Sequence, residues 1–329
     1  MKADLHVHSY YSGYASHLGF LRARDCYSDP FDIYRVAKLR GMDLVSITDH
    51  DSIDGCLKFL DRCPDAPDFI MGEEIECTFP HGHGSIRRED LKVHVGVLGI
   101  TERMHREIQP LRGNVFDAVA YLGQQDVFFA VNHLFFFVDG DLALERYVFE
   151  ILSIFGAAET RNGSMLQAHN ELIEQLFSGW SAFPPVARVG GSDAHTLTRI
   201  GRTYTEAPGR NREEFLANLK AGLGQVRGDH GSTWCVAGDI YTVITQYWSG
   251  LLGLRRDDLS WFRRLLGVAF SVPSLPFQFI PGMIVVAQKL NERRCIERYR
   301  RLLMSGPRVT FDEAVSDVAT AACAWDRTD

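Results

Sequence analysis

Strand-like and helix-like segments alternate along roughly the first 230 residues, and this alternation limits the possible fold more than any other feature. Ala3, Leu5 and Val7 alternate with polar residues, which is the period of a strand. Residues 32–40 have apolar side chains at helical spacing, and residues 43–48 form the next apolar run. Further strand-like runs lie at residues 69–71, 93–98, 127–131 and 186–189, and further helical patterns at 115–124 and 212–223. Such repetition predicts a parallel α/β sheet or barrel.

Metal-binding residue types gather near the ends of these predicted strands, where α/β barrels build their active sites. His6 and His8 share one face of the first strand, so they form an exception that lies inside a strand. The later groups are Asp49-His50-Asp51, Gly72-Glu73-Glu74, His94, Asn132-His133 and Asp193-Ala194-His195. Any one of them could be an ordinary hydrogen-bonded residue. Together they indicate a metal centre, because burying so many titratable groups is costly without a compensating cation.

The order of these motifs resembles a known family. The elements D-L-H-x-H-S, T-D-H-D, G-x-E, V-H-x-x-x-L-G, N-H and G-S-D-A-H are similar to those of the PHP (polymerase and histidinol phosphatase) superfamily of metal-dependent phosphoesterases. The resemblance covers roughly residues 1–230 and implies a distorted (β/α)7 TIM-like barrel with two or three divalent metal ions at its mouth. Mixed histidine and carboxylate ligands suit Mn, Fe or Zn. We expect residues 231–329 to form a mainly helical C-terminal extension of unknown role.

The resemblance also implies a ligand for each metal. The first metal would be held by His6, His8, Glu74 and Asp193, the second by Glu74, His94 and His133, and the third by His50 and His195. Many relatives have an aspartate as a further ligand of the third metal, but this chain has Gly13 at that position. Either His17 or Asp25 could replace it from the following loop, and we choose His17; the third site could also be weak or empty.

The implied reaction is hydrolysis of a phosphate ester by a hydroxide that bridges the first two metals. The implied catalytic residues are His6, His8, Glu74, Asp193 and His195. Arg161, Arg199 and Arg202 are candidate phosphate clamps, since a guanidinium bonds a phosphate through two N–H groups; the alternative is an ordinary surface ion pair. The substrate would be a small phosphorylated metabolite or a nucleotide. Alternative functions are a nuclease-like phosphodiesterase and a non-catalytic metal-binding or membrane-associated module of the same fold.

The net charge and the cysteines indicate which substrates and which cellular compartment to expect. A formal net charge of -7 argues against a broad surface for duplex nucleic acid, although bound cations would still give an anionic substrate a positive pocket. Seven cysteines form no C-x-x-C pair, and no signal-peptide pattern precedes the first strand. We therefore expect free thiols and a cytoplasmic location. The pattern leaves the oligomeric state open.

One segment of the C-terminal extension is unusually apolar. Residues 265–288 form a run of 24 residues without Asp, Glu, Lys, Arg or His, which is long enough to span a bilayer. Pro273, Pro276 and Pro281 interrupt it, and each proline inside a helix costs about 3 kcal/mol. We therefore expect a buried or interface-forming segment rather than a membrane span. Residues 291–304 form a basic helix with a solvated face, so membrane contact through residues 265–304 is possible but not favoured.

Overall fold

The computed structural model describes residues 1–14, 24–80, 91–125, 127–136, 144–179, 186–254 and 260–305. The strands are β1 (Lys2–Asp4), β2 (Leu44–Ile47), β3 (Phe69–Phe79), β4 (Leu91–Leu98), β5 (Phe128–Val131), β6 (Ala157–Asn162), β7 (Ala187–Gly191), β8 (Thr203–Glu206) and β9 (Gln225–Gly228). The helices are α1 (Pro30–Leu39), α2 (Asp54–Leu60), α3 (Glu102–Ile108), α4 (Val115–Gln124), α5 (Leu144–Ile154), α6 (Gln167–Gly179), α7 (Arg212–Lys220), α8 (Thr233–Leu251), α9 (Trp261–Ser271) and α10 (Ile280–Ser305), with 3-10 turns η2 (Gln109–Leu111) and η3 (Val272–Phe277).

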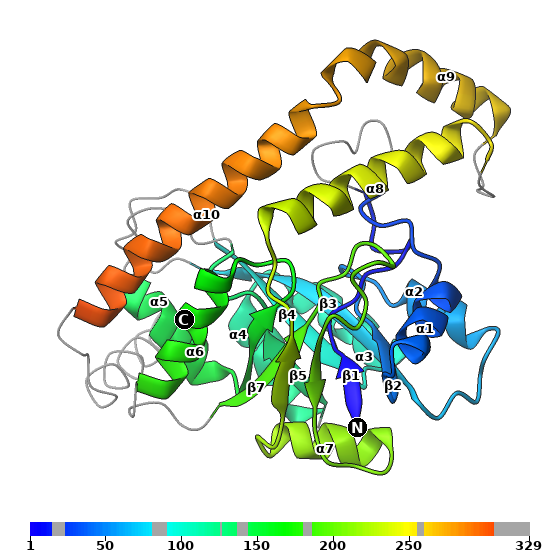
Figure 1. The fold of residues 1–329 in the computed structure, drawn as a ribbon. Helices are drawn as coiled ribbons and strands as arrows, with labels where there is room; N and C mark the ends of the chain where they lie inside the picture. The colour runs from blue at the N-terminus through cyan, green and yellow to red at the C-terminus, as the bar shows by residue number, and fades with distance from the viewer. Residues whose placement is uncertain are drawn as a thin grey trace, which may run out of the picture.

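The strands form one mixed, barrel-like sheet in the order β7-β6-β5-β4-β3-β2-β1-β8-β9 (Figure 1). Beyond β1, Val7 makes a parallel bridge to Ala194, which follows β7, and the His8 N–H donates to the Ala194 carbonyl at 3.0 Å. This bridge brings the first and seventh strands together and closes the barrel. The predicted distorted (β/α)7 barrel is confirmed. Its distortion lies at β4, which runs antiparallel to both β3 and β5.

Several helices begin where the sequence supplies a capping side chain. Asp29 accepts a hydrogen bond from the Phe31 N–H at the start of α1, and Asn114 and Asn211 cap α4 and α7 in the same way. The helices predicted near residues 32–40, 115–124 and 212–223 are confirmed. The strand predicted at 69–71 is too short, because β3 continues to Phe79 by pairing with β4 along its whole second half.

The described part of the C-terminal extension, residues 231–254 and 260–305, is helical, as expected, and α10 packs on the barrel domain. On α10, Ile296, Tyr299 and Leu303 are buried in the large apolar core that also covers β3, β4 and β5. The α8 helix is tied to the loop after β7, because the Thr196 hydroxyl donates to Asp239 at 2.7 Å. Between these two attachments, α8, α9 and the first part of α10 project beyond the barrel (Figure 1).

The apolar run does not form one helix. The α9 helix ends at Ser271, η3 contains two of the prolines, and α10 begins just before Pro281. In the part of the chain that the structure describes, no single helix has the length and apolarity to cross a bilayer. Trp261–Phe277 and Ile280–Met304 meet those criteria only as a pair, bent by 63°. The expectation of burial is wrong, because Leu265 and Phe270 are exposed.

Candidate metal centre

The predicted ligands come from six strand regions and meet at the mouth of the barrel. His6 and His8 follow β1, His50 follows β2, Glu74 lies in β3, His94 in β4, His133 after β5, and Asp193 and His195 after β7. The first motif is not an exception after all, since β1 ends at Asp4 and both histidines follow it. The structure therefore brings together every predicted metal ligand that it describes. His17 lies outside the described residues.

Glu74 occupies the centre of this group and is fully buried. Its Oε1 lies 3.2 Å from His6 Nε2, 3.2 Å from His94 Nδ1 and 3.1 Å from His133 Nε2. Its Oε2 lies 3.0 Å from His50 Nδ1 and 3.5 Å from His8 Nε2. One carboxylate thus faces five imidazoles, with a different set at each oxygen, which is the placement needed to bridge two cations.

Asp193 is a second carboxylate that faces two of these histidines. Its Oδ1 lies 3.5 Å from His6 Nε2 and 3.3 Å from His8 Nε2. Asp193 has a φ of 51° and His133 a φ of 28°, so both lie in the left-handed backbone region that non-glycine residues rarely adopt. Such backbone persists only where surrounding contacts enforce it, and it is typical of functional sites.

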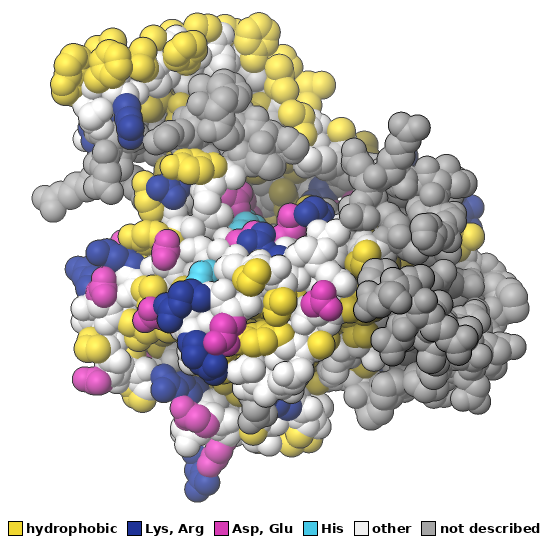
Figure 2. Space-filling model, turned by 180° about the vertical axis from the view of Figure 1, so that it is seen from behind, with side chains coloured by type: hydrophobic (Ala, Val, Ile, Leu, Met, Phe, Trp, Pro, Cys, Tyr) yellow, Lys and Arg dark blue, Asp and Glu magenta, His cyan; other side chains and the backbone are white. Residues whose placement is uncertain are grey.

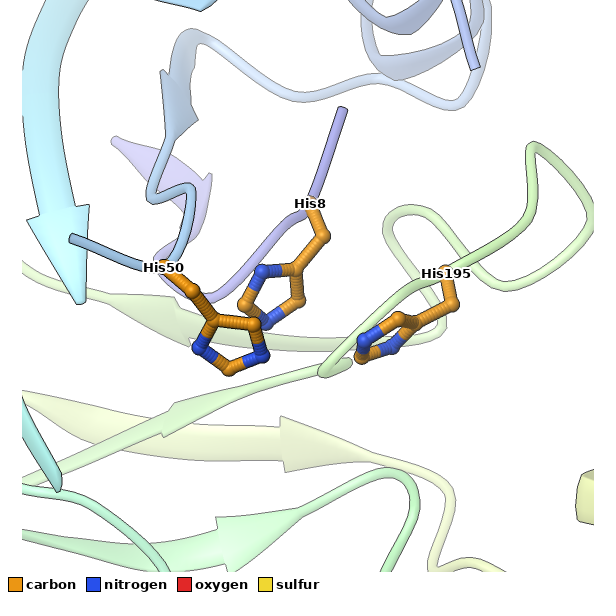
Figure 3. A group of neighbouring side chains, drawn as sticks. All are labelled: His8, His50 and His195. Atoms are coloured by element: carbon orange, nitrogen blue, oxygen red, sulfur yellow. The ribbon is translucent and has the colours of Figure 1, made fainter. Parts of the chain in front are cut away.

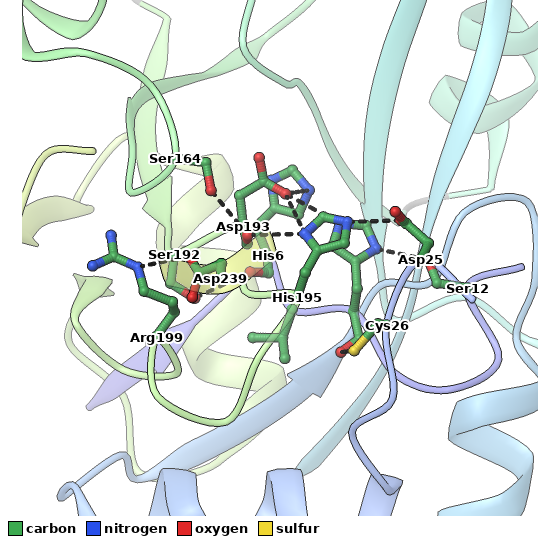
Figure 4. Close-up of polar contacts among 12 residues, drawn as sticks. His6, Ser12, Asp25, Cys26, Ser164, Ser192, Asp193, His195, Arg199 and Asp239 are labelled. Carbon is green, nitrogen blue, oxygen red and sulfur yellow. Dashed lines mark hydrogen bonds and ion pairs between the residues drawn. The ribbon is translucent and has the colours of Figure 1, made fainter. Parts of the chain in front are cut away.

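A third group forms at the outer edge of the site, where the rings of His8, His50 and His195 face one another (Figure 3). Asp25 joins this group: its Oδ2 lies 2.8 Å from His195 Nε2 and 3.6 Å from His50 Nε2 (Figure 4). Asp25 was the alternative to His17 in the sequence. Its side chain supplies the carboxylate that the loop lacks at Gly13. No spacing rule identifies it, because it lies on the far side of the loop from the first motif.

The donor atoms fit divalent cations. The Nε2 atoms of His6 and His8 are buried and make no hydrogen bond to any described residue. Carboxylate oxygens nevertheless lie 3.2 to 3.5 Å from them. Ligand atoms about 2.0–2.2 Å from one zinc-like ion lie about this far apart. Four overlapping groups of histidines and carboxylates have donor atoms close enough to share an ion. Nitrogen and oxygen donors without a thiolate suit Mn, Fe or Zn.

A second layer of polar side chains orients these ligands. His6 Nδ1 lies 3.0 Å from Glu159 Oε1, and the other Glu159 oxygen accepts hydrogen bonds from the His133 N–H and from Asn162. Asn132 donates to Glu74 Oε1 at 2.9 Å. Bonds of this kind fix the ring orientation and raise the basicity of a ligating histidine. Sequence reasoning missed Glu159, which is an isolated acidic residue in β6.

The local charges keep the carboxylates ionised. Burial alone would raise the pKa of Glu74, but the surrounding His6 and His94 hold it well below its usual range. Burial lowers the pKa of His8 to about 3, helped by the neighbouring His195 and His50. A neutral His8 ring keeps its Nε2 lone pair for a cation.

The three predicted arginine clamps have other partners. Arg161 pairs with Glu174 at 3.1 Å, and Arg202 lies 3.7 Å from Asp229 on the surface. Arg199 is buried and donates to the Gly163 carbonyl, with Asp239 nearby (Figure 4). The structure does not bring these guanidinium groups into the ligand cluster.

A pocket of 470 Å³ opens beside the cluster, between the barrel and the C-terminal helices. Asp25, Asp193 and His195 line its polar side. Its other walls come from the barrel (Phe135, Phe136, Met165), from α8 (Val236, Ile240, Val243) and from α10 (Lys289, Cys295, Ile296). Figure 2 shows histidine and acidic side chains in the hollow below the projecting helices. The sequence did not predict this pocket, because its walls are far apart along the chain.

A family model described as PHP-associated matches residues 185–223, which contain Asp193 and His195. The resemblance to the PHP superfamily is confirmed. An uncharacterized protein of Methanocaldococcus jannaschii is 37% identical to this chain over 93 residues. These residues are 28% of this chain and 53% of that protein, so the chain spans about half the length of this curated relative.

Three solved structures resemble the chain more loosely. PsfC of Pseudomonas syringae aligns with 74% of this chain and 98% of its own, with a TM-score of 0.49 and 16% identity. An amidohydrolase of Chromobacterium violaceum aligns with 63% and 92%, with a TM-score of 0.43 and 16% identity. A candidate metal-dependent phosphoesterase of Bifidobacterium adolescentis aligns with 66% and 96%, with a TM-score of 0.42 and 13% identity. Similarity at this level establishes neither a reaction nor a substrate.

Proposed function

We propose that this protein is a metal-dependent hydrolase that cleaves small phosphate esters. The observation that carries the proposal is the placement of Glu74, which faces five imidazoles and lies beside a pocket lined by Asp193 and His195. The order of the motifs, which resembles phosphoesterases, favours a phosphate ester as substrate. The pocket of 470 Å³ has the size of a small-molecule site, and the net charge of -7 disfavours a nucleic-acid polymer.

The described residues divide into three overlapping ligand sets. His6, His8, Glu74 and Asp193 would hold one ion, Glu74, His94 and His133 a second, and Asp25, His50 and His195 a third. Bound divalent ions would supply Lewis-acid activation of the phosphate and a water nucleophile at neutral pH. Glu159 holds the His6 ring, and Asn132 holds Glu74, so both ligands stay oriented without substrate. The apolar pocket walls would limit access of bulk water to the phosphate.

The test is activity after controlled metal loading. Protein stripped with a chelator and reloaded with Mn, Fe(II) or Zn is assayed for hydrolysis of p-nitrophenyl phosphate and bis-p-nitrophenyl phosphate, with metal content measured on the same samples. We expect two to three metal equivalents per chain and activity that returns only with metal. His8→Ala should lose both bound metal and turnover. His230→Ala is the matched control and should keep both, because His230 contacts Asn170 and belongs to none of the groups whose donor atoms could share an ion. Undiminished hydrolysis by metal-free protein would overturn the proposal.

A further inference from the structure

The projecting C-terminal helices expose a large amount of apolar surface. We define the arm as α8, α9, η3 and α10 up to Leu290. On the arm, Trp261 is 75% exposed, Phe270 69%, Met283 62% and Leu265 61%. Figure 2 shows hydrophobic side chains gathered along the top of the molecule, over the projecting helices. Soluble monomers rarely expose contiguous apolar patches of this kind unless the patch binds a protein or a membrane.

The charges of the arm favour a lipid surface over a protein partner. Residues 260–288 contain two arginines, Arg263 and Arg264, and no carboxylate. The arginines directly follow two exposed aromatic residues, Trp261 and Phe262. Aromatic rings and basic side chains side by side are typical of segments that lie at the boundary between acyl chains and anionic headgroups.

The shape of the arm also favours contact with a lipid surface. The arm projects beyond the barrel (Figure 1). Its two apolar helical parts meet at a bend of 63°. A bent pair of this kind can rest its apolar side on a bilayer without crossing it.

The other side of the same helices lines the candidate active-site pocket. Val236, Ile240 and Val243 of α8 and Ile296 of α10 line the pocket with apolar side chains, next to the polar Lys289 and Glu292 of α10. Asp193 and His195 lie at the metal end. The pocket therefore combines a place for a phosphate with a wall suited to an apolar chain. The apolar part of the pocket belongs to the helices of the C-terminal extension, and the metal end belongs to the barrel.

We propose that the arm binds the surface of an anionic bilayer, and that the pocket takes a phosphate ester bearing an apolar chain. The phosphate would lie at the metal cluster, and the chain would lie along the α8 and α10 wall. The substrate part of this inference rests on the proposed function. The membrane part rests on the arm alone.

The membrane part is tested by flotation of the full chain with vesicles of phosphatidylcholine and phosphatidylglycerol. We expect the wild-type protein to float and the double variant Leu265→Gln/Phe270→Gln to lose at least tenfold in the vesicle-bound fraction. Leu39→Gln is the control, because Leu39 is even more exposed, at 77%, but lies on α1 of the barrel. It should float as the wild type does. Absence of wild-type flotation, or equal flotation of the arm variant, would overturn the membrane part. A dimer that forms without lipid and is lost in the arm variant would assign the surface to a second copy of the chain instead.

The substrate part is tested by binding, independently of turnover. Calorimetry on metal-loaded protein compares decyl phosphate, below its micelle-forming concentration, with ethyl phosphate. We expect decyl phosphate to bind at least tenfold more tightly, and Val243→Asn to remove most of that difference. Equal affinities for the two esters in the wild type would overturn the substrate part.

The two proposals fail in different ways. If p-nitrophenyl phosphate is hydrolysed and decyl phosphate has no binding advantage, the proposed function stands and the apolar substrate class is wrong. If no phosphate ester is hydrolysed at any metal loading, the proposed function fails, and the flotation result still decides whether the arm binds lipid.

Discussion

The barrel mouth buries polar side chains, whereas the arm exposes apolar ones. At the mouth, His6, His8 and Glu74 are almost completely removed from solvent, while in the arm Trp261 and Phe270 are mostly exposed. Charged and polar side chains are usually exposed and large apolar ones buried, so the mouth and the arm depart from this rule in opposite ways. Such departures concentrate at functional sites, where the missing stabilisation comes from a bound group. The comparison indicates cations for the mouth and an apolar surface for the arm.

We expect the largest loss of turnover from replacing a predicted metal ligand at the mouth of the barrel. Asp193→Asn keeps the size of the side chain but removes the charge that faces His6 and His8. Because loss of an outer-layer partner already costs about 10–100-fold, we expect loss of this ligand to lower turnover by more than about a hundredfold. Steady-state kinetics and metal analysis of the variant measure this. Near-normal turnover would show that Asp193 is not a ligand.

We expect a smaller effect on metal binding from replacing a residue that orients a ligand than from replacing a ligand. Glu159→Gln weakens the contact that orients the His6 ring at 3.0 Å, and we expect about a 10–100-fold loss of metal affinity with the fold retained. Metal titration by calorimetry gives the affinity. Glu174→Gln is the matched control, since Glu174 pairs with Arg161 away from the cluster. If the control loses as much affinity as Glu159→Gln, the effect is not specific to ligand orientation.

The sequence predicted the mouth far better than the arm. The motifs identified His6, Glu74 and Asp193 because each lies in or next to a locally recognisable strand pattern, and the order of the motifs resembles a known family. Period and spacing did not decide between His17 and Asp25, since the position of a loop carboxylate depends on the path of the loop. They also gave no indication of Glu159, whose role depends on a ring contributed by another strand.

The arm was predicted only in part, for a related physical reason. The prolines correctly indicated that residues 265–288 would not form one straight helix. Whether that segment is buried depends on where α10 packs, and α10 is attached through Ile296, Tyr299 and Leu303 to helices more than a hundred residues earlier. The pocket depends on the same long-range packing, so no local pattern could have predicted it.

The attachment between arm and barrel gives a third, pH-dependent prediction. Glu292 on α10 accepts the Leu166 N–H at 2.9 Å and lies 2.6 Å from Lys289 Nζ. Burial alone would raise the pKa of Glu292, but His169, 3.4 Å away, and Lys289 lower it to about 2. A lowered pKa stabilises the fold above the unfolded value near 4.5, and this stabilisation is lost as the pH falls from about 4.5 to about 2.

We therefore expect Glu292→Gln to lower the free energy of unfolding by about 1–2 kcal/mol at pH 7 and by less at pH 3. Denaturant unfolding at the two pH values measures the difference. Glu297→Gln on the same helix is the control, because Glu297 pairs with Arg293 on the surface and should change stability little at either pH. A difference between Glu292→Gln and the wild type that does not shrink at pH 3 would contradict the assignment.

The smallest expected effect is on the free energy of unfolding, when exposed apolar residues of the arm are replaced. If the exposed apolar side chains of the arm serve a surface outside the chain, they contribute little to folding. Leu265→Gln/Phe270→Gln should then change the free energy of unfolding in lipid-free buffer by no more than about 0.5 kcal/mol. Replacing two buried residues of similar size, Ile296→Gln with Leu303→Gln, should cost several kcal/mol, since both lie in the core between α10 and the barrel. A large loss of stability in the Leu265/Phe270 variant would mean that these side chains pack against part of this chain. The proposal that the arm binds a lipid surface would then be wrong.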